Sequence, residues 1–210
     1  MLSLIHIFCA VPESAPLPEE AFAAFGEDAD AARRLHAAFL DGKEYGSLTE
    51  PGVTLREVSA LRHRMLTMHI FDPRTMKLDS LSDALDAVDA LSPLVDAAEM
   101  LLQKYDVVAT NPPYMGASNM NAVLAAFVKK EYPDSKGDLF AVFIERCRAF
   151  AKAGGYQAMI TQHAWMYLSS FEKLRMKLQS VDTQNMAHLG ARAFEEIGGE
   201  VVQTLSLIHI

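Results

Sequence analysis

The chain has 210 residues and a mass of 23.1 kDa, which is enough for one domain, or one and a half, with a buried core. Half of its residues are apolar, 22% are charged and 9% are aromatic, and this composition excludes disordered, collagen-like and disulfide-framework proteins. Two cysteines, Cys9 and Cys147, are too few for a zinc cluster, and no run of 18 apolar residues predicts a membrane span. The net charge of −8 falls on residues 1–104, which hold 9 basic against 17 acidic residues; residues 105–210 hold 10 of each. The sequence therefore predicts no basic nucleic-acid surface of its own.

One hexapeptide, Leu-Ser-Leu-Ile-His-Ile, occurs at residues 2–7 and again at residues 205–210. It resembles a translation of the mosaic-end adapter that transposases insert when sequencing libraries are made. We therefore interpret residues 1–8 and 205–210 as adapter-derived scars that do not belong to the fold. On this interpretation the chain is a fragment whose reading frame is truncated at both ends.

Residues 9–103 are predicted to form a helical, acidic, insert-like region without a catalytic pattern. The predicted helices cover residues 19–40, 54–68, 80–91 and 93–104, after a proline-rich linker at 11–18. In the third of them the apolar residues recur every three or four positions, as on one face of a helix. Pro93 cannot continue that helix but suits the first turn of a new one, so we expect a break at Ser92–Pro93.

Residues 104–204 are predicted to form an α/β domain. The predicted strands are 105–110, 156–161, 185–189 and 200–204, and the predicted helices are 120–130, 138–153 and 169–180. The first strand is mostly apolar and β-branched, which predicts burial on both faces. Strands and helices that alternate at this spacing predict the second half of a doubly wound sheet. Ligands of such sheets bind beyond the carboxyl ends of the strands, where Asn111 stands.

The tetrapeptide Asn111-Pro112-Pro113-Tyr114 follows the first predicted strand. A residue before proline avoids the helical region, so Asn111 and Pro112 are both expected to be extended. The two prolines fix two φ angles and remove two amide donors. What remains is a stiff segment with two acceptors, the Asn111 side-chain oxygen and the Pro112 carbonyl, beside the aromatic ring of Tyr114. This combination suits a planar ligand that carries an amino group.

The tetrapeptide resembles motif IV of the S-adenosylmethionine-dependent DNA methyltransferases that methylate amino groups. Three stretches resemble, more narrowly, the PglX family, the adenine-specific methyltransferases of BREX phage-defence systems. They are YDVVATNPPYMG (105–116), YPDSKGDLFAVFIERC (132–147) and the region from WMYLSSFEKLR to AHLGARAFEEIGGEVVQT (165–204). The resemblance implies an α/β fold class, in which the C-terminal half of a Rossmann-like methyltransferase sheet is preceded by a mostly helical region. Residues 104–204 would then be part of a methyltransferase catalytic domain.

The resemblance also implies a mechanism. The target adenine is flipped out of double-stranded DNA, and its amino group donates hydrogen bonds to Asn111 and to the Pro112 carbonyl. The methyl group of S-adenosylmethionine then passes in line to the amino nitrogen. Residues 111–114 (Asn111, Pro112, Pro113 and Tyr114) are the implied catalytic residues, with Tyr114 stacked on the base and Phe194 on its opposite side. Positioning and electrostatics supply the catalysis, and no metal is required.

The cofactor-binding motif of the family, a Gly-rich turn after the first strand, is absent from residues 1–104. No cofactor-binding residue is assigned, and we expect the fragment to be inactive although the full-length protein is an enzyme. The resemblance implies double-stranded DNA as the partner, with other phage-defence proteins as further candidates and no membrane. It also implies a location in the bacterial cytoplasm.

Other residues with chemical potential receive plainer interpretations. A core position is as good an interpretation of Phe194 as a stacking role. Trp165 and Tyr167 are expected to be packing residues, and His163 is expected to be an ordinary loop histidine. Cys147 lies on the apolar face of a predicted helix and is expected to be an inert core thiol.

Two alternative functions stay open. Protein-glutamine methyltransferases also use an Asn-Pro-Pro-Tyr signature, because a glutamine amide presents the same amino group. The chain could instead belong to a non-catalytic scaffold or DNA-sensing subunit built on a methyltransferase-like sheet. A reading frame near 300 residues without a DNA-recognition region would favour the first alternative, and an upstream Gly-rich turn degraded to bulky residues would favour the second.

Overall fold

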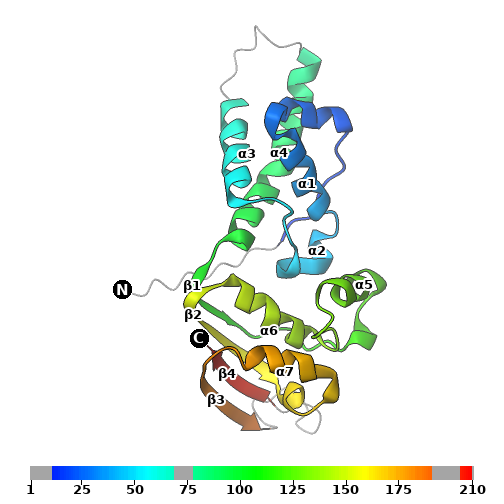
Figure 1. The fold of residues 1–210 in the computed structure, drawn as a ribbon. Helices are drawn as coiled ribbons and strands as arrows, with labels where there is room; N and C mark the ends of the chain where they lie inside the picture. The colour runs from blue at the N-terminus through cyan, green and yellow to red at the C-terminus, as the bar shows by residue number, and fades with distance from the viewer. Residues whose placement is uncertain (1–10, 69–77, 191–203, 210) are drawn as a thin grey trace. The chain divides into compact units, whose positions relative to one another are not determined.

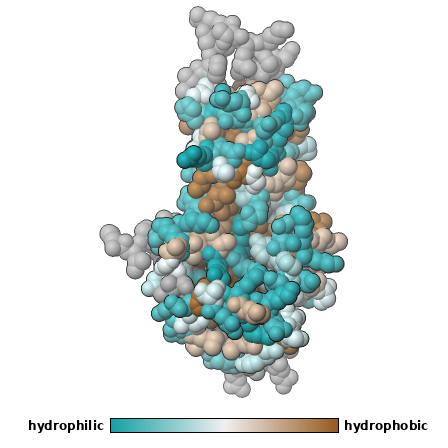
Figure 2. Space-filling model, in the orientation of Figure 1, coloured by the Kyte–Doolittle hydropathy of each residue, from teal (hydrophilic) through white to brown (hydrophobic). Residues whose placement is uncertain are grey.

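A computed structural model describes residues 11–68, 78–190 and 204–209 of the chain. The chain divides into two compact units, Met1–Gln103 and Lys104–Ile210, and each is described by itself (Figure 1). The face visible in Figure 2 is mainly hydrophilic, with hydrophobic side chains scattered over it. No helix in the described ranges is long and apolar enough to cross a membrane.

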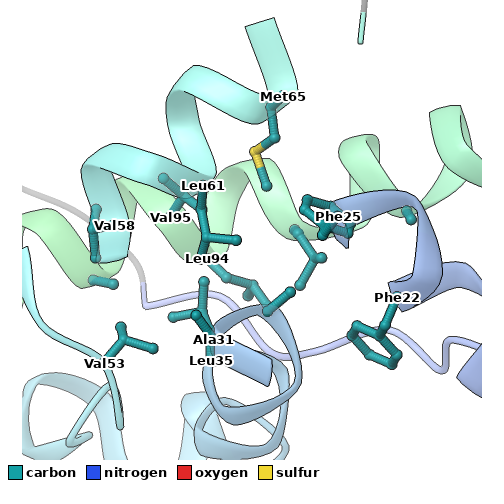
Figure 3. Close-up of a cluster of buried hydrophobic side chains, with 14 of the residues drawn as sticks. Phe22, Phe25, Ala31, Leu35, Val53, Val58, Leu61, Met65, Leu94 and Val95 are labelled. Carbon is teal, nitrogen blue, oxygen red and sulfur yellow. The ribbon is translucent and has the colours of Figure 1, made fainter. Parts of the chain in front are cut away.

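The first unit is helical, as predicted. Its elements are a 3-10 segment at Glu19–Asp28, α1 (Ala29–Ala38), α2 (Gly42–Tyr45), a 3-10 turn at Gly46–Leu48, α3 (Leu55–Met68) and α4 (Leu78–Leu102). The core side chains come from four of these elements, and Figure 3 shows Phe25, Leu35, Leu61 and Leu94 gathered between them. All four of these side chains are fully buried. The single helix expected over residues 19–40 is wrong, because Gly26, inside the 3-10 segment, has a φ of +56° and kinks the chain before α1 begins.

The predicted helix break at Pro93 is also wrong. Helix α4 runs through Pro93, although a proline inside a helix removes a hydrogen bond and costs about 3 kcal/mol. The side chains on either side of it, Leu91 and Leu94, are both fully buried, and burial of one such side chain contributes roughly 1.5–3 kcal/mol. Pro93 itself is exposed. The apolar face therefore continues past the proline and offsets the missing hydrogen bond.

The second unit contains a four-stranded sheet in the order β1-β2-β4-β3. Its strands are β1 (Tyr105–Thr110), β2 (Ala151–Gln162), β3 (Thr183–Gly190) and β4 (Thr204–His209). Its helices are α5 (Ala122–Glu131), α6 (Leu139–Phe150) and α7 (Glu172–Leu178), with 3-10 turns at Ala117–Asn119, His163–Met166 and Ser169–Phe171. Strand β1 is parallel to β2, whereas β4 runs antiparallel to both of its neighbours. The predicted α/β architecture is confirmed, with a mixed sheet in place of a wholly parallel one.

The last strand lies in the segment that was expected to fall outside the fold. Residues 204–209 pair with β2 on one side and with β3 on the other, and Leu207 is only 1% exposed. The expectation that residues 205–210 do not belong to the fold is therefore wrong for 205–209. A short run of alternating aliphatic residues can fill a strand position through its backbone bonds and one apolar face, whatever its origin. The adapter origin itself stays a prediction, and residues 200–203 and 1–10 lie outside the described residues.

Strand β1 is open on one face, in contrast to the predicted burial on both. Helix α6 packs against β1 and β2, and Val108 joins the core beneath it. Val107 points the other way and is 47% exposed. Among the described residues β1 has β2 as its one sheet neighbour, so it is an edge strand.

Helix α6 ends three residues earlier than predicted, and β2 begins directly after it at Ala151. Gly154 and Gly155 are therefore inside the strand, where the β1–β2 register shifts between Tyr105 and Val107. A Cβ at Gly155 would lie 3.0 Å from the carbonyl oxygens of Tyr105 and Asp106. Glycine thus suits the close approach of the two strands, because a Cβ there would crowd the backbone of β1.

Candidate active site

The Asn-Pro-Pro-Tyr segment leaves the sheet at the carboxyl end of β1, as predicted. The last residue of the strand, Thr110, pairs with Met159 of β2. Asn111 follows and is exposed, Pro112 is buried, and Pro113 is exposed. The segment thus has a buried anchor and presents the Asn111 side chain to solvent at the edge of the sheet where ligands of α/β proteins bind.

Tyr114 is held from two sides. Its hydroxyl donates a hydrogen bond to the Ile160 carbonyl oxygen of β2 at 3.2 Å, and its ring meets the Phe140 ring of α6 edge-on, with 6.0 Å between centroids. The side chain is half-buried. Burial raises the pKa of its hydroxyl, and the negative charge of Asp138 raises it further. Tyr114 therefore stays a neutral donor, and its ring is fixed against α6 at the end of the tetrapeptide.

The sequence analysis did not identify Asp138, the residue before α6, as part of this site. Its Oδ1 accepts a hydrogen bond from the Met115 amide at 3.0 Å, directly after the tetrapeptide. Burial raises the pKa of this carboxyl, and backbone hydrogen bonds from Phe140, Met115 and Leu139 oppose that shift. An aspartate that precedes an apolar helix is an N-cap signal, which could have marked the residue. Its contact with Met115, 23 positions earlier, has no local sequence signal.

The turn after β2 lies next to the tetrapeptide, because Tyr114 bonds to Ile160 near the end of that strand. Trp165 is buried, and its indole donates a hydrogen bond to the Thr161 hydroxyl at 3.2 Å, which confirms the packing role. Tyr167 is 65% exposed, so the packing role predicted for it is wrong. The His163 ring lies edge-on to Tyr167, with 5.5 Å between centroids, and edge-on to His188 of β3, with 5.6 Å between centroids. These three rings form a row at the carboxyl ends of β2 and β3.

Cys147 is a core residue, as predicted. The side chain is buried among the apolar residues of α6, β2 and α7. Burial raises the pKa of its thiol to about 12, so the thiol is protonated and unreactive at neutral pH.

Three features remain: the second stacking residue, a metal site and a cofactor-binding turn. Phe194, the second predicted stacking residue, lies outside the described residues. In the described part of the chain no group of three or more His, Cys, Asp or Glu residues could hold a metal ion. In those same ranges, no strand is followed by a Gly-rich turn that could hold S-adenosylmethionine.

Comparison with known proteins defines the class. Residues 58–194 match the Eco57I restriction-modification methylase family. The chain is 46% identical over 171 residues to the adenine-specific methyltransferase PglX of Lacticaseibacillus casei, and 40% identical over 177 residues to the adenine-specific methyltransferase BrxX of Escherichia coli. These alignments cover 81% and 83% of the chain but 14% of each relative. The class is therefore that of restriction-modification methylases. The chain belongs to the Eco57I restriction-modification methylase family.

A solved structure from Listeria monocytogenes, assigned to the class I S-adenosylmethionine-dependent methyltransferases, superimposes with a TM-score of 0.39 and 12% sequence identity. The superposition covers 91% of this chain and 86% of that one.

Proposed function

We propose that the protein containing this chain is an adenine-specific DNA methyltransferase, and that residues 111–114 bind the amino group that is methylated. One observation carries the proposal. A segment with two acceptors and few donors stands at the carboxyl edge of the sheet, with the Asn111 side chain exposed and the Tyr114 ring, three positions further on, fixed against Phe140. Both curated relatives are named adenine-specific methyltransferases, which supports DNA adenine as the substrate.

The chemistry follows from those acceptors. The Asn111 side-chain oxygen and the Pro112 carbonyl accept the two hydrogens of the adenine amino group, which turns the nitrogen lone pair away from the ring. S-adenosylmethionine supplies an electrophilic methyl group on a sulfonium. With S-adenosylmethionine bound, this lone pair would take the methyl group as the C–S bond breaks, the C–S electrons would stay on sulfur in S-adenosylhomocysteine, and one amino proton would pass to solvent. Acceptors already aimed at the amino group stabilise the positive charge that develops on it during transfer.

Tyr114 has a second role in this proposal. Its hydroxyl is already bonded to Ile160, so the aromatic ring, and not the hydroxyl, is left for the substrate. A flipped base would stack on the ring face, and stacking of this kind contributes about 1–3 kcal/mol per base. Phe194 is the proposed second ring, on the opposite side of the base.

The cofactor side of the site is not built from the described residues. We propose that the chain alone is inactive. The tetrapeptide orients only the amino group that accepts the methyl group, whereas binding of S-adenosylmethionine needs a Gly-rich turn in addition. The relatives named PglX and BrxX support a role in BREX phage defence, with double-stranded DNA as substrate and other defence proteins as candidate partners. We propose a location in the bacterial cytoplasm, because DNA of this kind is the proposed substrate.

The test begins with the uninterrupted reading frame recovered from the source DNA. The full-length protein is incubated with radiolabelled S-adenosylmethionine and either duplex DNA or a glutamine-containing protein substrate. The proposal is supported if label is transferred to adenine N6 and if the rate of this transfer is lower by about 10²-fold or more in Asn111→Ala. Label on glutamine contradicts the DNA substrate, and DNA binding without any transfer makes the protein a scaffold subunit.

A further inference from the structure

The catalytic segment is fixed at its two ends by different means. Its first residue, Asn111, follows strand β1, whose pairing with β2 runs to Thr110 and Met159. Its last residue, Tyr114, is followed by Met115, and the amide of Met115 donates to Oδ1 of Asp138 at 3.0 Å. The same oxygen accepts from the Phe140 amide at 3.3 Å in the first turn of α6. One carboxylate oxygen thus joins the end of the segment to the beginning of a helix.

Backbone hydrogen bonds reinforce this junction. The Leu139 amide donates to the Met115 carbonyl oxygen at 3.0 Å, and the Ala117 amide donates to the Gly137 carbonyl oxygen at 3.0 Å. Gly116 and Asp138 form an isolated antiparallel bridge. Residues 115–117 and 137–139 therefore make a short clamp, which we name the 115–139 clamp, and helix α5 lies in the excursion between its two arms.

The helix that carries the clamp is itself immobilised. Phe140 and Ile144 of α6 are fully buried in the core of the second unit. Lys177 of α7 bridges Glu145 of α6, at 2.6 Å, and Asp134 of the loop before the clamp, at 2.8 Å. A negative carboxylate before α6 also interacts favourably with the positive end of the helix dipole. The clamp is thus built on a rigid support.

We propose that Asp138 is a positioning residue of the methyl-transfer site. By holding the Met115 amide it fixes where the segment ends, and with it the direction of the Pro112 carbonyl and the Asn111 side chain. The inference rests on the proposed function for its catalytic consequence. The clamp itself is a property of the chain and can be measured without activity.

Three variants of the full-length protein separate positioning from helix capping. Asp138→Ser keeps a good cap for α6, because serine caps helices about as well as aspartate, but its side chain is shorter and loses the Met115 amide. Asp138→Asn keeps an acceptor oxygen at the same distance. Asn121→Ser is the matched control, because Asn121 caps the other helix next to the clamp, α5, by accepting from the Leu124 amide at 2.8 Å.

Three quantities are measured for each variant: amide hydrogen exchange at Met115, the single-turnover rate of methyl transfer to DNA, and the affinity for S-adenosylmethionine. We expect Asp138→Ser to speed Met115 exchange about tenfold and to slow methyl transfer by about 10- to 100-fold, the range for a displaced reacting group, while the affinity for S-adenosylmethionine is unchanged. In Asp138→Asn we expect the Met115 exchange rate and the methyl-transfer rate to stay within about threefold of wild type. Asn121→Ser should leave both as in wild type.

The outcomes are decisive. Unchanged Met115 exchange in Asp138→Ser would show that the clamp does not depend on the carboxylate and would overturn the proposal. Slower transfer in Asn121→Ser, equal to that in Asp138→Ser, would reduce Asp138 to a structural cap. If Met115 exchange responds as expected but Asn111→Ala does not affect methylation, the clamp stands and the proposed function of residues 111–114 fails.

Discussion

The Tyr114 hydroxyl donates to the Ile160 carbonyl oxygen of β2 at 3.2 Å, so the aromatic residue of the candidate site is fastened to the strand beside the one it follows. Tyr114→Phe removes this bond but keeps the ring. We expect the free energy of unfolding of the second unit to fall by about 1 kcal/mol, because a carbonyl loses its partner, while base stacking persists. Chemical denaturation of the chain measures the change.

A matched control is Tyr156→Phe. Tyr156 lies on β2, the strand of Ile160, and its side chain is nearly half exposed. Its effect on stability should stay within about 0.5 kcal/mol. Equal losses in the two variants would contradict a specific role for the Tyr114 hydroxyl.

Gly155→Ala tests the close approach of β1 and β2. The added Cβ would meet the carbonyl oxygens of Tyr105 and Asp106 at 3.0 Å, and backbone atoms cannot swing aside as a side chain can. We expect a loss of about 1–3 kcal/mol in the free energy of unfolding. Gly116→Ala is the control, because its Cβ would have Asp138 Oδ2 as its nearest neighbour at 3.8 Å and its φ of −61° suits alanine. A Gly155→Ala protein as stable as Gly116→Ala would refute the packing described for these strands.

The burial of Cys147 gives a prediction about reactivity. Its thiol pKa of about 12 means that a negligible fraction is thiolate at pH 8 in the folded protein. In a Cys9→Ser background, we expect an aromatic disulfide reagent to label Cys147 only when denaturant is added. Rapid labelling of the native chain would contradict the core position of the thiol.

Asp138 links the stability of the site to pH. Burial raises the pKa of its carboxyl above the value in the unfolded chain, so the folded state binds its proton more tightly than the unfolded state does. The stability that this group contributes is therefore present below its unfolded pKa, about 3.9, and is lost as pH rises through the folded pKa. Wild type should gain stability relative to Asp138→Asn as the pH falls from about 7 to about 4. A difference that shrinks or reverses over this range would show that the net shift has the opposite sign.

The position of the candidate site could be predicted from the sequence because every signal for it is local. A β-branched run that stops at Asn111-Pro112 marks the end of a strand, and prolines restrict the backbone whatever surrounds them. The same local character explains why Trp165 and Cys147 were correctly assigned to packing. Cys147, in particular, continues an apolar face of α6 that Phe140 and Ile144 already form.

The features that escaped prediction depend on distant partners. Pro93 is tolerated inside α4 because the helix packs on the rest of its unit, and strand β4 forms because β2 and β3 leave a gap that its backbone fills. The contact between Asp138 and Met115 joins residues 23 apart. None of these contacts leaves a periodic or spacing signal in the residues themselves.

The central claim is that residues 111–114 bind the amino group of a target adenine, and one substitution tests it most directly. In the full-length protein, Asn111→Ala should lower the single-turnover rate of N6-adenine methylation about 10²-fold or more, because a transition-state acceptor is lost, while binding of S-adenosylmethionine is unchanged. Methylation at the wild-type rate in Asn111→Ala would contradict the account.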